Sequence, residues 1–382
     1  MNPGILGASS ASPVSDFDHQ DRIFSTPFSI LNTAIADRAF PAASIAITHQ
    51  GRVIALKSFG RFTYESDSPD VGTSTLFDLA SLTKVVATTT AAMVLYQRGL
   101  LDLEVPVAAI IPEFTSGAEK DPRRSEVTFQ MLLAHCSGLP AYERLFLRAH
   151  TREDLLHAAF TTSLTADPGS RAEYSDIGFI LLGVALERLA DESLDRFCQR
   201  EIFAPLGMIH TTFNPPAEIR AQIPSTADDQ TFRYRIIQGE VQDENASVLG
   251  GVAGHAGLFS TAADLANFAH AMLNGGRPIL RPETVALFTC RETTPAGTSR
   301  TRGWDTPSAP SQSGKYFGPA SFGHLGYTGT SLWIDPAGKL SITMLTNRTW
   351  PDCSNEAIRK VRPLFHDAVV ETIEKSACGE SG

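Results

Sequence analysis

The chain has 382 residues, of which 42% are hydrophobic and 19% charged, and its formal net charge at pH 7 is −10. These values are typical of a folded globular protein, and the length favours two lobes or one large domain with an insertion. The acidic balance and the scattered Lys and Arg residues argue against a nucleic-acid partner.

The five cysteines are far apart and form no metal-binding spacing, so we expect no metal and no organic cofactor. No segment reaches the ~18 consecutive apolar residues of a membrane span. The N-terminus lacks the basic and apolar regions of a signal peptide. We therefore expect a cytoplasmic protein without a membrane span, or a periplasmic one if a leader has been trimmed. The sequence leaves the oligomeric state open.

The N-terminal part of the chain contains few but clear signals. Residues 1–20 are small, polar and aperiodic, which predicts a disordered lead-in. A helical pattern follows at 30–35. Two apolar segments, 43–48 and 53–56, flank a glycine-containing turn and predict a β-hairpin. Residues 79–100 are almost continuously apolar, which predicts a buried helix.

The middle of the chain, residues 101–249, has helical patterns punctuated by Pro and Gly and predicts an all-helical lobe. These patterns lie at 128–135, 152–160, 177–190 and 193–203. After it come a glycine-rich bend at 250–257, a long loop at 291–320, strands at 321–327, 330–335 and 340–347, and a final helix at about 354–375.

Strands near both chain ends with helices between them predict an α/β (α+β) fold. We expect an antiparallel sheet built from N- and C-terminal strands and flanked by helices, in a lobe made of residues 21–100 and 250–376. The helical lobe, 101–249, is inserted into it. A cleft between the two lobes is the expected site.

Ser81 and Lys84 are three residues apart, which is about one turn of a helix, so their side chains can meet. An apolar surround would lower the pKa of Lys84 toward that of a usable base for the hydroxyl, and the helix N-terminus would favour an oxyanion beside Ser81. The alternative is that Ser81 caps the helix and Lys84 extends to solvent.

Two further segments change the balance between these interpretations. Residues 173–183 read EYSDIGFILLG, and residues 322–333 read FGHLGYTGTSLW. The order of motifs is Ser81-x-x-Lys84, then Tyr174-Ser175-Asp176, then His324-Leu325-Gly326. In this order the chain resembles the class C β-lactamase-like serine hydrolases, a superfamily that includes DD-peptidases (penicillin-binding proteins) and family VIII esterases.

The resemblance runs from about residue 25 to 370, and the chain is most similar to the branch with penicillin-binding protein 4B-type DD-carboxypeptidases. It implies a β-lactamase/transpeptidase-like fold. It also implies that Ser81 is the acyl-accepting nucleophile and that Lys84 and Tyr174 transfer protons. An ammonium beside the phenol is expected to push Tyr174 toward phenolate.

The motifs depart from the family pattern in two places. Asp176 stands where the lactamases commonly have Asn; a carboxylate accepts hydrogen bonds only, so Asp176 either keeps Lys84 charged or caps the following helix. His324 and Leu325 stand where lactamases have Lys-Thr. Histidine is only partly charged near neutral pH and leucine has no hydroxyl, so recognition of a substrate carboxylate is weakened.

The resemblance also implies how the oxyanion is bound. Gly326 allows the backbone to approach a ligand closely, and the N–H of Tyr327 is the expected second donor beside that of Ser81. His135 and His255 are expected to be structural. Trp304 either lines the cleft or anchors its loop, and Ser175 either donates a hydrogen bond or fills a turn.

We therefore predict a serine acyl hydrolase that acts through a Ser81 acyl-enzyme on a small-molecule ester or small amide, as an esterase or a DD-carboxypeptidase-like enzyme. The first alternative is a class C-like β-lactamase. The second is a non-catalytic ligand-binding protein on the same scaffold. No Gly-x-Ser-x-Gly elbow, Walker loop or HExxH motif supports another enzyme class.

Overall fold

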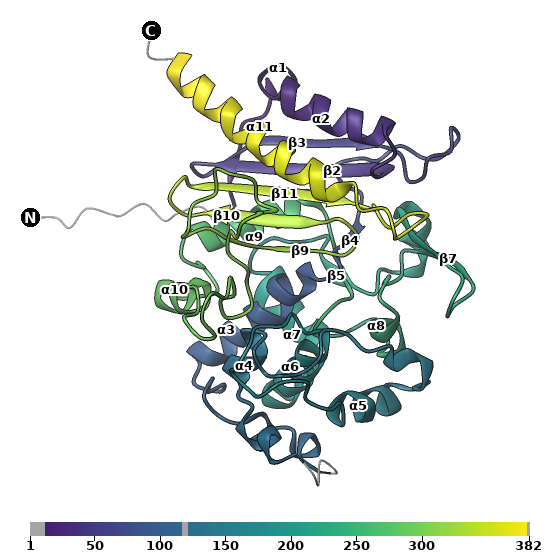
Figure 1. The fold of residues 1–382 in the computed structure, drawn as a ribbon. Coiled ribbons are helices and arrows are strands. Elements are labelled where there is room, and N and C mark those ends of the chain that lie inside the picture. The colour runs from purple at the N-terminus through teal and green to yellow at the C-terminus, as the bar shows by residue number, and fades with distance from the viewer. Residues whose placement is uncertain (1–11, 117–120, 380–382) are drawn as a thin grey trace, which may run out of the picture.

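The computed structural model describes residues 12–116 and 121–379, with side chains described as far as residue 376. A six-stranded sheet lies at the centre of one lobe (Figure 1). Its order is β1-β3-β2-β11-β10-β9, so N- and C-terminal strands meet where β2 pairs antiparallel with β11, as predicted. The strands are β1 (Val14–Ser15), β2 (Ala42–His49), β3 (Arg52–Gly60), β9 (Phe322–Leu325), β10 (Ser331–Asp335) and β11 (Leu340–Thr346).

Helices cover both faces of this sheet (Figure 1). Side chains alternate between the faces of a strand, so Ile45 and Ile47 of β2 pack in one apolar cluster with α2 and α11. Ala42 and Ala46 point the other way, into the larger core that contains α9. The helices of this lobe are α1 (Gln20–Ile23), α2 (Ser25–Ala36), α9 (Ala262–Leu273), α10 (Pro282–Thr289) and α11 (Ile358–Gly379).

The predicted disordered lead-in is wrong for the residues just before α1. Val14 N donates to Gly51 O at 3.1 Å and Asp16 N donates to Val53 O at 2.8 Å, which adds β1 parallel to β3. Backbone pairing of two residues leaves no apolar periodicity in the sequence, so the pattern could not reveal it. Residues 1–11 lie outside the described residues.

The second lobe, 101–249, is mostly helical but not all-helical as predicted. Its α-helices are α4 (Phe129–Leu133), α5 (Arg152–Phe160), α6 (Asp176–Ala190), α7 (Leu194–Cys198) and α8 (Glu244–Val248), and a π-helical segment, η6 (Gln199–Phe203), continues α7. The shorter 3₁₀ segments are η2 (Val107–Ala109), η3 (Pro112–Phe114), η4 (Pro122–Glu126), η5 (Leu145–Leu147) and η7 (Ala217–Gln222).

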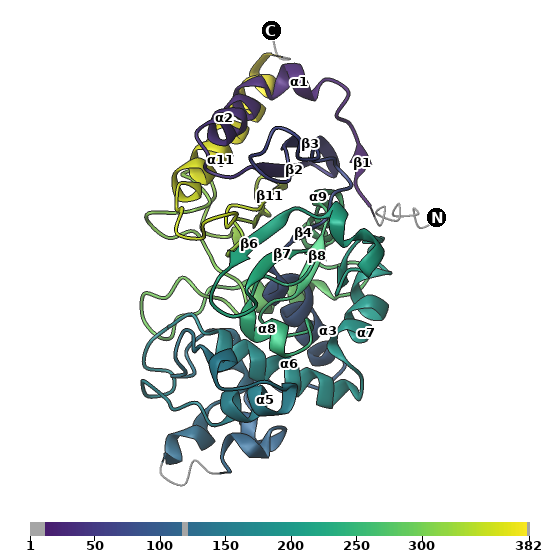
Figure 2. The same cartoon turned by 90° about the vertical axis from the view of Figure 1, so that its right-hand side faces the viewer.

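Three strands fall inside this range. β5 (Thr212–Phe213) joins β4 (Phe77–Asp78) and β8 (Leu258–Ser260) in a small sheet. β6 (Ser225–Asp229) and β7 (Arg235–Gln238) form a separate hairpin that lies between the sheet and the helical lobe (Figure 2). β6 reads Ser-Thr-Ala-Asp-Asp and has no apolar alternation, so its sequence gives no strand signal.

The buried helix predicted for 79–100 is present but not uniform. It starts near Leu82, widens into the π-helical segment η1 (Lys84–Thr89) and ends as α3 (Thr90–Gln97). Every side chain of η1 is buried. π-Helical turns are rare and occur frequently at functional sites. The predicted loop 291–320 contains no helix or strand in the described chain.

Candidate active site

Ser81 lies at a tight turn between β4 and the buried helix. The preceding residue, Ala80, has a φ of +47°, in the left-handed region that residues with a Cβ rarely adopt. Asp78 supports this turn, because its Oδ1 accepts a hydrogen bond from Ala80 N at 2.8 Å. The Ser81 hydroxyl caps no N–H among the described residues and instead contacts two side chains, so the capping interpretation is wrong.

Lys84 is fully buried one turn beyond Ser81. Its Nζ donates to Ser81 Oγ at 3.0 Å and to His255 O at 2.9 Å, and it pairs with Asp176 Oδ1 at 2.6 Å. Burial alone would lower the pKa of Lys84, but Asp176 and Tyr174 outweigh burial and hold this pKa above its usual value. Lys84 is therefore an ammonium at neutral pH. Both the lowered pKa and the solvent-exposed alternative are wrong.

Tyr174 completes the cluster around the hydroxyl. Its OH donates to Ser81 Oγ at 2.7 Å, and Lys84 Nζ lies 4.9 Å from the centre of its ring. Burial raises the pKa of Tyr174, Lys84 opposes this rise and Asp176 adds to it, so the pKa stays above its usual value. The resting side chain is thus a neutral phenol, and the expected shift toward phenolate is wrong.

Ser175 and Asp176 divide the two roles that the sequence left open. Ser175 caps α6, since its Oγ accepts from Gly178 N at 3.1 Å, and it also donates to Pro140 O at 2.7 Å. Asp176 is the first residue of α6 and is therefore free to pair with Lys84. The capping role belongs to Ser175, and the carboxylate of Asp176 is the counter-ion of the buried ammonium.

His324 on β9 faces the same cluster, with its ring centre 5.9 Å from that of Tyr174. Burial, Lys84 and Arg300 together lower the pKa of His324 to about 3. The imidazole is therefore neutral, not partly charged as expected. Its Nδ1 donates to Leu325 O at 2.8 Å, which leaves Nε2 as a hydrogen-bond acceptor.

Gly326 is required by the close packing of β9 against the Ser81 turn. A Cβ at this position would lie 2.5 Å from Leu79 O and 2.0 Å from Thr330 Oγ1. Thr330 Oγ1 in turn donates to Leu79 O at 2.9 Å, which ties the strand to the turn. Within residues 12–116 and 121–379, neither Ser81 N nor Tyr327 N donates a backbone hydrogen bond. Both N–H groups are available for an oxyanion.

These residues open into a cleft of about 710 Å³ that draws its lining from both lobes. The predicted residues in the lining are Ser81, Tyr174, Asp176, His324, Leu325, Gly326 and Tyr327. Lys84 lies behind Ser81. Trp304 does not line the cleft, because it is fully buried against Phe268 and Phe322 and anchors its loop.

Arg300 is a cleft residue that the sequence did not indicate. Its guanidinium lies 5.4 Å from the centre of the Tyr174 ring, and its side chain is only 20% exposed. Its ion pair with Asp305 is long, at 3.5 Å. Arg300 belongs to an irregular loop, where no periodicity predicts which way a side chain points. Its position four residues before Trp304, a candidate for the cleft, was the one signal in the sequence. His135 is structural as expected: Nδ1 accepts from Ser175 N at 2.9 Å.

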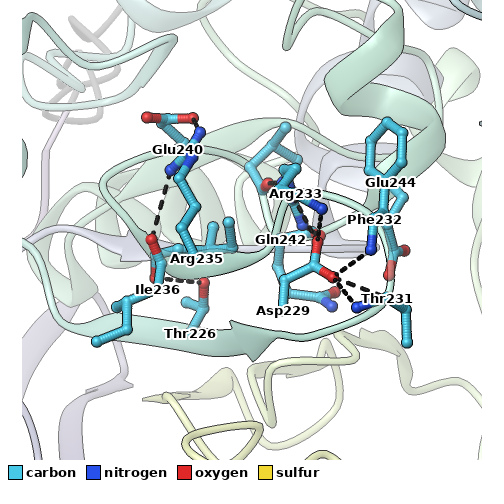
Figure 3. A network of polar contacts seen from close by, with 12 residues as sticks. Thr226, Asp229, Thr231, Phe232, Arg233, Arg235, Ile236, Glu240, Gln242 and Glu244 are labelled. Carbon is cyan, nitrogen blue, oxygen red and sulfur yellow. Dashed lines mark hydrogen bonds and ion pairs between the residues drawn. The ribbon is translucent and has the colours of Figure 1, made fainter.

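The β6–β7 hairpin forms another wall of the cleft, through Thr231 at its tip. Asp229 organises this tip by accepting from the backbone N–H of Thr231, Phe232 and Arg233 and by pairing with the Arg233 side chain at 2.8 Å (Figure 3). Arg233 also donates to Val241 O at 2.7 Å and to Gln242 O at 2.6 Å. The hairpin is therefore fastened to the segment 241–243.

Two observations concern other kinds of site. In the described part of the chain, no group of three His, Cys, Asp or Glu side chains could hold a metal ion. None of the helices there is long and apolar enough to cross a membrane.

The chain is similar to known proteins in sequence and in fold. The Beta-lactamase family model matches residues 29–362. A putative D-alanyl-D-alanine carboxypeptidase of Escherichia coli is 31% identical over 82% of this chain and 79% of its own length. An N-acetylmuramyl-L-alanine amidase of Bacillus subtilis is 32% identical over 81% and 77% of the two chains. The solved structure of EstCE1, described as a hydrolase with promiscuous acyltransferase activity, shares the fold with a TM-score of 0.72 at 22% identity, over 92% of this chain and 99% of its own.

Proposed function

The chain belongs to the beta-lactamase family and is a serine hydrolase of that family, and from this premise we propose that it forms an acyl-enzyme on Ser81 from an ester or a small amide. One observation carries the proposal. Ser81 Oγ receives hydrogen bonds from both Lys84 Nζ, at 3.0 Å, and Tyr174 OH, at 2.7 Å. A nucleophilic hydroxyl needs such an adjacent proton acceptor, and this pair becomes one when it loses a proton.

The protonation states of Lys84 and Tyr174 determine which form of the enzyme is active. At rest Lys84 is an ammonium and Tyr174 is a phenol, so neither can take the proton of Ser81. Release of one proton from this pair to solvent creates the base. Because Asp176 raises the pKa of both groups and burial adds to the rise at Tyr174, the rate of acylation is expected to rise with pH above neutrality.

Acylation then proceeds as an addition and an elimination. The Ser81 proton moves to the Lys84–Tyr174 pair while Oγ bonds to the acyl carbon, and the electron pair of the carbonyl moves to its oxygen. The N–H groups of Ser81 and Tyr327 hold that oxyanion. On collapse, the proton passes to the leaving group and the acyl group stays on Oγ. A water molecule, deprotonated by the same pair, releases the acid and restores Ser81.

The substrate is proposed from the polar groups of the cleft. His324 is neutral and Leu325 is apolar, so β9 offers no cation to a substrate carboxylate. A carboxylate would depend on Arg300, whose own ion pair is loose, or on Arg144, which also lines the cleft. The names of the two relatives point to the amide bonds of D-alanyl-D-alanine and of N-acetylmuramyl-L-alanine, and the neutral β9 favours an uncharged ester or amide. We propose the broader class, an ester or small amide.

Two other functions can be distinguished from this proposal by experiment. A class C-like β-lactamase would use the same acylation but requires fast deacylation of a carboxylate-bearing substrate. A non-catalytic binding protein would use the cleft alone. The contact of Ser81 with both Lys84 and Tyr174 favours catalysis over binding alone.

The decisive experiment treats the protein with a fluorophosphonate and with a labelled penicillin and locates each adduct by peptide mass mapping, with Ser81→Ala as the control. We expect the fluorophosphonate on Ser81. Penicillin label that persists for hours would favour a DD-peptidase, and label that is lost rapidly would favour a β-lactamase. If neither reagent modifies Ser81, the acyl-enzyme proposal is wrong.

A further inference from the structure

A buried carboxylate–imidazole pair lies beside the Ser81 cluster and has no part in the mechanism above. His255 Nε2 is 2.8 Å from Asp243 Oδ1, and the His255 side chain is 1% exposed. His255 Nδ1 has no hydrogen-bond partner among the described residues, so the ring is held through Nε2 alone. Both residues also line the cleft.

The main chain of His255 connects this pair to Lys84. The His255 carbonyl accepts from Lys84 Nζ at 2.9 Å, the third contact of the ammonium after Ser81 and Asp176. The contacts with Ser81 and His255 are hydrogen bonds and the contact with Asp176 is an ion pair, and together they hold Nζ toward Ser81. Displacement of the carbonyl would leave one buried N–H without a partner and let Nζ turn away from Ser81.

The bend that carries this carbonyl is closely packed on its N-terminal side. Gly254 O accepts from Thr88 Oγ1 at 2.6 Å, and a Cβ at Gly254 would lie 2.1 Å from Phe179 O. On its C-terminal side, Leu258 N donates to Thr83 Oγ1 at 3.1 Å. Between these two fixed ends, the hydrogen bond of the His255 side chain to Asp243 further restricts the bend.

Asp243 is in turn held on both sides. It accepts from Ala246 N at 2.7 Å and so caps α8. The neighbouring Gln242 N donates to Asp78 Oδ2 at 2.7 Å, and Gln242 O receives Arg233 from the hairpin (Figure 3). The segment 241–243 therefore links the hairpin, the turn before Ser81 and the acceptor of Lys84.

The charge of Asp243 also acts on the cluster. Burial opposes its ionisation, but His255, the Ala246 N–H and the Lys84 charge outweigh burial and hold the pKa of Asp243 below its usual value. The Asp243 carboxylate and the Lys84 ammonium therefore attract each other, although only Asp176 forms an ion pair with Lys84 among the described residues. The ionisable groups that face Lys84 are Tyr174, Asp176, Asp243, His135, His255 and His324.

We infer that Asp243 and His255 are positioning residues for acyl transfer, because they fix the carbonyl that aims Lys84 at Ser81. The inference rests on the proposed function.

The test compares His255→Ala, His255→Gln and Asp243→Asn in the full chain. Glutamine keeps a donor near the position of Nε2, and asparagine keeps the oxygen that caps α8. His366→Gln is the matched control, because His366 is also fully buried but lies in the other apolar cluster, beside Phe317. The readouts are kcat and KM for p-nitrophenyl acetate, the pH profile of kcat/KM, and fluorophosphonate labelling of Ser81.

We expect His255→Ala to lower kcat about 10- to 100-fold with KM within about threefold, since a ~1 Å displacement of a reacting group has effects of this size. His255→Gln should recover most of that loss. Asp243→Asn should move the rising limb of the pH profile to lower pH, because it removes a charge that favours the protonated ammonium. The control should match the wild type.

A His255→Ala enzyme with kcat within threefold of wild type would overturn the inference, and so would a control that loses as much. If His255→Ala does not fold, Asp243→Asn decides: an unmoved pH limb with unchanged kcat overturns it. A wild-type enzyme whose Ser81 takes no label overturns the proposed function instead, and is recognised before any variant is compared.

Discussion

The hydroxyl of Tyr174 is the most direct residue-scale test of the site. Tyr174→Phe removes the 2.7 Å hydrogen bond to Ser81 Oγ but keeps the ring beside Lys84. Loss of a proton-transfer group typically costs 10²- to 10⁴-fold, so kcat for short-chain p-nitrophenyl esters should fall by at least ~100-fold. Tyr316→Phe, which alters an exposed tyrosine bonded to Glu371, is the control. Turnover of Tyr174→Phe within a few-fold of wild type would exclude it from the mechanism.

Asp176 is predicted to set the pH at which the enzyme becomes active. Its carboxylate raises the pKa of both Lys84 and Tyr174, so Asp176→Asn should lower both values. The rising limb of kcat/KM against pH should then move to lower pH. Glu173→Gln removes a neighbouring carboxylate that pairs with Arg171 and should leave the limb in place. An unchanged limb in Asp176→Asn would show that another group controls the proton balance.

At this scale the sequence predicted which residues meet but not their charge states. The spacing of Ser81 and Lys84 left two interpretations open, and the cluster was predicted from the family resemblance carried by the order of the motifs at Ser81, Tyr174 and His324. The pKa shifts of Lys84 and Tyr174 were predicted with the wrong sign, because Asp176 and Tyr174 outweigh burial at Lys84, while burial and Asp176 together outweigh Lys84 at Tyr174. That balance depends on distances across the fold, which one sequence does not contain. The involvement of Arg300 was missed for the same reason.

The end of β9 packs closely against the Ser81 turn, so we expect Gly326→Ala to lower kcat strongly. The added Cβ would lie 2.0 Å from Thr330 Oγ1 and 2.5 Å from Leu79 O, so the strand or the turn must move. Movement separates the N–H groups of Ser81 and Tyr327. Loss of one oxyanion donor costs about 10²- to 10³-fold in kcat, and we expect a decrease of that order.

The matched control for this change is Gly318→Ala, since a Cβ at Gly318 meets no atom within 4 Å. Steady-state kinetics and thermal unfolding of both variants separate the effects. Gly326→Ala should lose activity and also melt at a lower temperature. Full activity in Gly326→Ala would mean that the strand and the turn tolerate the displacement, and that Tyr327 N is not a required donor.

Elements whose apolar pattern is long were predictable, and those held by polar or main-chain contacts were not. The hairpin of β2 and β3, the strands β10 and β11 and the helix α5 all appear where the pattern indicated. The β6–β7 hairpin was missed because its tip is held by Asp229 and its bonds to backbone N–H groups, which leave no periodic signal. The π-helical turn at Lys84 was missed because every residue from 84 to 89 is buried, so the sequence has no amphipathic period that would distinguish a π-helix from an α-helix.

At the scale of the whole molecule, the order of the elements determined the fold class. Strands at the chain ends and helices between them require the termini to meet in one sheet, and β2 pairs with β11 accordingly. This arrangement brings Ser81, from the first quarter of the chain, against His324, from its last part. The same arrangement buries several ionisable groups where the lobes meet. One of them is expected to make the free energy of unfolding depend on pH.

Asp78 is that group. It is fully buried, and burial raises its pKa from 3.8 to about 6 although Gln242 N and Ala80 N donate to it. A carboxyl group with a raised pKa in the folded state binds its proton more tightly there than in the unfolded chain. Its contribution therefore favours folding below pH 3.8 and is lost as the pH rises through about 6.

The prediction compares the wild type with Asp78→Asn, which has no titrating group at this position. Each unit of pKa difference corresponds to ~1.4 kcal/mol, so the free energy of unfolding of the wild type should fall by about 2 kcal/mol relative to the variant between pH 4 and pH 7. Urea denaturation of both proteins at a series of pH values measures this difference, in which the other titrating groups cancel. A difference that stays constant across the series would mean that Asp78 ionises at its ordinary pKa, and that its two backbone donors compensate for burial at the turn that positions Ser81.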